Sequence, residues 1–87
     1  SYRAKGPKEG IEMTALDSDK ICSLIVWENE TAIDCPQEDI DRHGLTTTYE
    51  VICDNYDDCT EVDLFDADND CIGSTTVGEI RKFVYGE

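Results

Sequence analysis

Short apolar runs separated by turn signals constrain the fold of this chain more than any other feature. Residues 11–15 alternate between apolar and polar side chains, 21–27 are almost continuously apolar, and 61–65 alternate again. Such runs, bounded by Asp, Asn, Ser and Gly, predict strands. Further strands are expected over 31–35, 46–53, 75–77 and 80–85, the last two as one strand broken near Gly78, with a loop or single helical turn over 37–44.

Six or seven short strands without a helical period predict an all-β fold, a small antiparallel β-sandwich. The central run at 21–27 is expected to be buried on both faces of its sheet. Trp27 and Tyr49 are therefore expected in the core or in half-buried strand positions.

The five cysteines provide a second constraint, since a chain of 87 residues has a small core. It buries only about 60% of its unfolded surface, and disulfides commonly compensate in small secreted proteins. Cys53 and Cys59 flank a short loop, and Cys22 and Cys35 lie on neighbouring predicted strands, so we expect these two pairs. Cys71 would then be free or pair with a second chain. Other pairings stay open.

Charge divides the chain into an arm and a body. Arg3, Lys5 and Lys8 lie in the first eight residues, whereas the whole chain carries a net charge of −14. We expect a basic N-terminal arm over 1–9 and one folded domain over 10–87. Nucleic acid is excluded as a partner of so acidic a body, but the arm could dock on an acidic neighbour.

Several features indicate export. Asn29-Glu30-Thr31 is an N-glycosylation acceptor, and the cysteine content is typical of extracellular proteins. No apolar run is long enough to span a bilayer, and Ser1 follows no signal-peptide pattern. We expect a secreted glycoprotein that is not transmembrane, present here as a mature or excised fragment.

Three alternating aspartates follow the strand predicted at 61–65. Asp66, Asp68 and Asp70 precede Gly73 in a compact loop, where close carboxylates can converge on a hard cation such as calcium. An EF-hand would also place ligands at this spacing. However, its glycine position holds Cys71 and its final bidentate position holds Val77.

The segment TEVDLFDADNDCIGSTTVGEI resembles the closing half of a C-two domain, the calcium-dependent phospholipid-binding module of synaptotagmin, protein kinase C and perforin. Asp66 and Asp68 match that family's Asp-x-Asp loop, and Asp70 its later acid. The resemblance implies that Asp17 and Asp19, before the run at 21–27, face these aspartates across one end of the sandwich. The match covers about a quarter of the chain, and the family's basic strand is absent.

A second resemblance is to the rhamnose-binding lectins of eggs and latrophilin. It rests on residues 30–36, Cys53, Cys59 and residues 65–73, while the Tyr-Gly-Arg sugar motif of that family is missing.

No catalytic motif stands out. His43 is the only histidine and is expected in an exposed loop, and neither a Gly-x-Ser-x-Gly motif nor a phosphate loop occurs. We therefore expect no enzyme. The sequence instead predicts an interaction module that binds calcium through Asp17, Asp19, Asp66, Asp68 and Asp70 and engages a protein, glycan or lipid surface. The alternative is a self-assembling subunit of an extracellular fibre or matrix, joined by its arm, a strand edge or an interchain disulfide.

Overall fold

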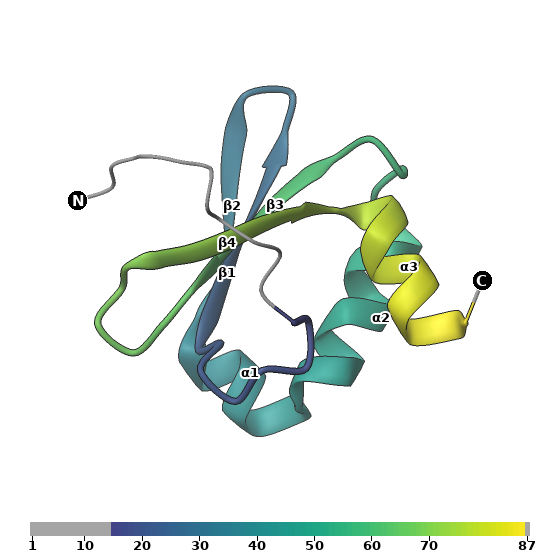
Figure 1. Ribbon diagram of the computed structural model, residues 1–87. Coiled ribbons are helices and arrows are strands. Elements are labelled where there is room, and N and C mark those ends of the chain that lie inside the picture. Colours follow the sequence, from purple (N-terminus) through teal and green to yellow (C-terminus); the bar gives the residue numbers. More distant parts are fainter. Residues whose placement is uncertain (1–14, 87) are drawn as a thin grey trace.

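The computed structural model describes residues 15–86 and has two layers, a four-stranded antiparallel sheet and three helices packed on one of its faces (Figure 1). The elements are β1 (Ser23–Glu28), β2 (Thr31–Cys35), α1 (Gln37–His43), α2 (Leu45–Asn55), β3 (Glu61–Phe65), β4 (Cys71–Thr76) and α3 (Val77–Tyr85). The strand order in the sheet is β2-β1-β3-β4. The predicted all-β sandwich is therefore wrong, because helices, and not a second sheet, cover the core.

Three of the predicted strands are confirmed as β1, β2 and β3. The strand expected over 11–15 lies almost entirely outside the described residues. The aspartate loop is followed by β4, which begins at Cys71, earlier than predicted. The short helix α1 agrees with the helical alternative for 37–44 and ends at Gly44, whose φ of 91° is left-handed.

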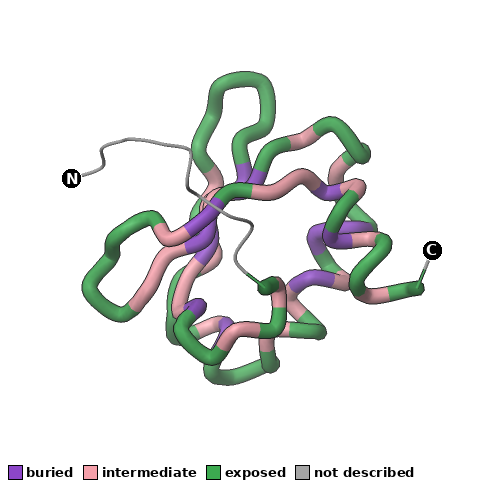
Figure 2. The backbone as a smooth tube through the Cα atoms, viewed as in Figure 1, coloured by how far each residue is buried: buried purple, intermediate pink, exposed green. Residues whose placement is uncertain are grey.

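The core lies between the sheet and the helices, as the burial colours of Figure 2 show. Alternate strand residues point into it, so Leu24 and Val26 of β1 are buried beside Val62 and Leu64 of β3. The helices contribute Ile40, Tyr49, Ile52, Cys53, Val77 and Ile80 to this cluster, and Ile21 joins it from the segment before β1. One face of the sheet is thus used for the core, and none of the helices described in residues 15–86 covers the other face.

Residues 46–53, predicted as a strand, belong to helix α2. The three consecutive threonines and the following aromatic and branched residues favour a strand locally. However, Tyr49, Ile52 and Cys53 are the buried residues of α2, which is the i, i+3, i+4 spacing of one helix face. Burial of that face in the core that α2 shares with α1, α3 and the sheet outweighs the local preference.

The last predicted strand, 80–85, is helix α3. The hydroxyl of Thr76 caps the helix by accepting a hydrogen bond from the backbone N–H of Glu79, at 3.3 Å. At the other end Gly86 adopts a left-handed φ of 77°, and its N–H donates to the Lys82 carbonyl. The Thr-x-x-Glu sequence at 76–79 is the residue spacing of a capping box, a sequence signal for this helix.

The predicted disulfides do not form, and all five cysteines are free. Cys35 pairs with Leu24 across the β1–β2 hairpin, so Cys22 lies two positions away on the diagonal. Diagonal neighbours are about 7–8 Å apart, beyond the usual Cα separation of a disulfide. Cys53 is buried in α2, whereas Cys59 is exposed in the loop that follows.

Candidate functional site

The face of the sheet opposite the helices carries three rows of side chains. Strand pairing places Asp34, Ile25, Asp63 and Ser74 in one row and Ala32, Trp27, Glu61 and Thr76 in the next. A third, shorter row pairs Ser23 with Phe65 and Phe65 with Cys71. We call this surface the open face. Its centre is an apolar stripe along β1, flanked by carboxylates on β2 and β3.

Trp27 is held in place on the open face. Its indole Nε1–H donates a hydrogen bond to Asp63 Oδ2 at 3.0 Å, and the Ser74 hydroxyl donates to the other carboxylate oxygen at 2.8 Å. Nevertheless 38% of the Trp27 surface is exposed. The expected core or half-buried position is therefore wrong for Trp27 and confirmed for Tyr49, which is fully buried. A large aromatic ring in water, fixed by a hydrogen-bonded chain from three strands, is suited to contact with a partner.

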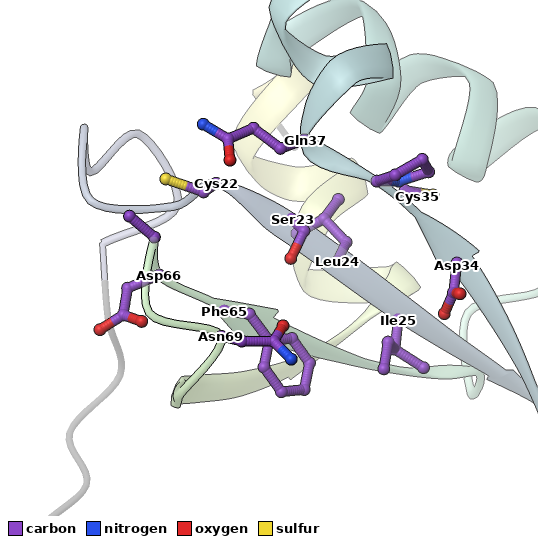
Figure 3. Close-up of a pocket in the computed structure, with 12 residues that line it drawn as sticks. Cys22, Ser23, Leu24, Ile25, Asp34, Cys35, Gln37, Phe65, Asp66 and Asn69 are labelled. Carbon is purple, nitrogen blue, oxygen red and sulfur yellow. The ribbon is translucent and has the colours of Figure 1, made fainter.

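A groove of about 430 Å³ continues the open face towards the β3–β4 loop (Figure 3). Ile25 and Phe65 line it from adjacent strands, both half-buried, and Asp34 lines it from β2. Asp66 and Asn69 border it from the loop. The groove therefore combines an apolar floor with carboxylates, as the open face does.

The charge of the open face is uniformly negative. None of the four strands contains Lys, Arg or His, whereas Asp34, Glu61 and Asp63 lie on the open face. In the helices, Arg42 pairs with Asp39 and Lys82 with Glu79 within one helical turn. Arg81 bonds Asp58 at 2.9 Å and the Cys53 carbonyl at 3.2 Å.

The aspartate loop is a compact turn between β3 and β4. Asp66 Oδ1 accepts hydrogen bonds from the backbone N–H groups of Asp68, at 2.9 Å, and Asp70, at 3.0 Å. One carboxylate oxygen from each of the three aspartates can be chosen so that all lie within 4.8 Å of one another. The predicted ligands on this loop thus converge, and the side chain of Asp66 also closes the turn.

The structure does not add Asp17 and Asp19 to this group. Within residues 15–86 the cluster contains the three loop aspartates alone. Asp17 instead lines a separate cavity of about 250 Å³ beside Tyr49 and Phe83, and its charge contributes to the raised pKa of Tyr49.

A second groove of about 430 Å³ lies between the end of β2 and the helices, and Cys35 and His43 both line it. In the sequence, the spacing of Cys35 and His43 gave no indication that they line one groove. Burial raises the pKa of the Cys35 thiol, and the nearby charges of Asp39 and Asp34 raise it further. The thiol is therefore protonated at neutral pH and is a poor nucleophile.

The predicted glycosylation acceptor lies at the tip of the β1–β2 hairpin. Asn29 and Thr31 are both exposed there, and Asn29 has a left-handed φ of 53°. None of the described helices is long and apolar enough to cross a membrane.

Comparison of the chain with known protein families, with curated protein sequences and with solved structures finds no match. The resemblances to C-two domains and to rhamnose-binding lectins stay predictions.

Proposed function

We propose that this chain is a non-catalytic interaction domain that binds a protein partner through the open face of its sheet. The observation that carries the proposal is the fixed, exposed indole of Trp27 next to the half-buried Ile25 on β1, with the half-buried Phe65 further along the same face. An apolar stripe rimmed by polar groups on a surface without a helical layer is typical of interaction sites. The raised pKa of the Cys35 thiol also disfavours nucleophilic catalysis in the second groove.

Selection from a random displayed peptide library tests this proposal, because the library favours no charge or motif. Peptides selected on the full chain are measured again on Trp27→Ala and on the matched control Val51→Ala, which truncates an apolar side chain that is 54% exposed on α2. We expect Trp27→Ala to weaken most selected peptides about tenfold or more, as for truncation of an aromatic anchor. Circular dichroism verifies the fold of both variants. Selected peptides that bind Trp27→Ala as tightly as the unmodified chain would contradict the proposal.

Calcium binding at the aspartate loop is a second candidate function, favoured by the convergence of the three carboxylates within 4.8 Å. Calorimetric titration of the EDTA-treated protein should then show saturable binding with a Kd of about 10⁻⁴ to 10⁻³ M. Asp68→Asn should abolish the heat, and the control Asp41→Asn, on α1, should not. Absence of heat and of any change in melting temperature at millimolar calcium would show that the loop does not bind calcium and is only a turn closed by Asp66.

A further inference from the structure

The geometry points to a basic, extended segment of a partner protein as the occupant of the open face, an inference that rests on the proposed function. Two rows of the face place an apolar side chain of β1 beside acids on adjacent strands. Ile25 lies between Asp34 and Asp63, and Trp27 lies beside Glu61. A ligand that covers the apolar stripe therefore comes within reach of carboxylates on both sides.

Strand dimensions match this occupant. Ile25 and Trp27 are two residues apart on one strand, about 6.6–6.8 Å, which equals the repeat of side chains on one face of an extended ligand. The neighbouring strands lie about 4.8 Å to either side, within the span of a Lys or Arg side chain whose apolar stem covers the stripe. The indole of Trp27 adds a surface for a cation, next to the carboxylate that it hydrogen-bonds.

Charge favours such a segment over the other occupants. A second copy of this chain that paired through the same face would bring Asp34, Glu61 and Asp63 against the same acids, and like charges in contact are unfavourable. Nucleic acid and anionic lipid are repelled for the same reason. A Lys- or Arg-bearing segment neutralises three carboxylates on a face whose four described strands contain no Lys, Arg or His.

Fluorescence titration of the full chain tests the inference, since Trp27 is the only tryptophan. The probes are capped peptides of about eight residues, enough to cross β1, with identical Val and Phe content and with Lys, Gln or Glu at the remaining positions. We expect the Lys peptide to change the Trp27 emission and the Gln peptide to bind about tenfold more weakly at low salt, with no binding of the Glu peptide.

Two charge-matched double variants separate the open face from the general charge of the molecule. Asp34→Asn with Glu61→Gln should weaken the Lys peptide about tenfold, whereas Asp41→Asn with Glu50→Gln, on the helices, should leave its affinity within about twofold. Equal losses in both variants would overturn the inference.

The other possible results of the peptide titration also test the inference. Equally tight binding of the Gln or Glu peptide at Trp27 would overturn the basic occupant while leaving the open face as a binding surface. If none of the three peptides binds, the inference of a basic occupant is overturned as well. The proposed function is then tested separately by the library selection. A change of Trp27 emission with protein concentration alone would identify a second copy of this chain, and not a different protein, as the occupant, and would overturn the inference.

Discussion

Tyr49 connects the helical layer to the segment before β1. Its ring is fully buried, packs edge-on against Phe83 with centroids 5.9 Å apart, and its hydroxyl donates a 2.7 Å hydrogen bond to the Leu16 carbonyl. Burial raises the pKa of Tyr49, and the charge of Asp17 raises it further. The folded state therefore retains the phenol proton more strongly than the unfolded chain does.

Replacement of Tyr49 by Phe should have opposite effects at neutral and at alkaline pH. At pH 7 the lost hydrogen bond should cost about 1 kcal/mol of unfolding free energy. A pKa raised on folding gives stability that is complete below the unfolded pKa of about 10 and is lost above it, at about 1.4 kcal/mol per pH unit. The unmodified chain should thus no longer be more stable than Tyr49→Phe near pH 11.

Urea unfolding of both proteins between pH 7 and pH 11, with reducing agent present, measures this difference. The pKa values of Cys35 and Cys53 are also raised by burial, so both proteins should share a loss of stability that begins near pH 9. A difference between the two proteins that stays constant over the whole range would show that Tyr49 does not titrate differently in the folded state.

At the scale of elements, the turn of the β1–β2 hairpin contains a strained backbone conformation that a single substitution can relieve. Asn29 and Glu30 both have left-handed φ values, 53° and 73°, as a two-residue turn of the primed type requires. Asparagine tolerates this conformation, but a residue such as glutamate is disfavoured by about 1 kcal/mol or more. Glu30→Gly should therefore raise the unfolding free energy by up to about 1 kcal/mol, measured by urea denaturation.

Glu30→Ala is the matched control, because it removes the same charge but keeps the Cβ atom that causes the strain. It should change stability little. If both variants stabilise the protein equally, relief of charge repulsion and not backbone conformation would be the cause.

Sequence patterns predicted the strands more reliably than the helices. The two hairpin strands and β3 follow directly from apolar runs and turn residues, but the same kind of pattern predicts strands over the segments that form helices α2 and α3. In both segments, branched and aromatic residues favour strands locally, whereas the burial that selects a helix, at i, i+3 and i+4 in α2, depends on what packs against it. The capping spacing at 76–79 was readable in the sequence.

The candidate site was predicted only in part. Asp66, Asp68 and Asp70 lie close together, as their spacing indicates, because neighbours in a tight turn lie close whatever the fold, and their role as metal ligands stays a prediction. The open face was not predicted, because the almost continuous apolar run at 21–27 indicates a strand buried on both faces of its sheet. In the described residues 15–86 the three helices lie on one face of the sheet, and no described helix or strand covers the other face.

At the scale of the whole molecule, self-repulsion should limit stability. The chain carries 21 acidic residues against 7 Lys and Arg, and surface ion pairs such as Arg42–Asp39 contribute little. Added NaCl shortens the screening length from about 30 Å at 0.01 M to about 3 Å at 1 M. The melting temperature should therefore rise between these salt concentrations, by several degrees, since about 1 kcal/mol shifts it by roughly 4–8 °C at this size.

The identity of the cation separates screening from a specific site. NaCl and KCl should raise the melting temperature equally, because screening depends on ionic strength alone. Calcium chloride at matched ionic strength should raise the melting temperature more than NaCl or KCl does only if the aspartate loop binds calcium. Asp68→Asn should then remove only this additional rise. A melting temperature that falls with NaCl would instead mean that ion pairs such as Arg81–Asp58 outweigh the repulsion among the acids.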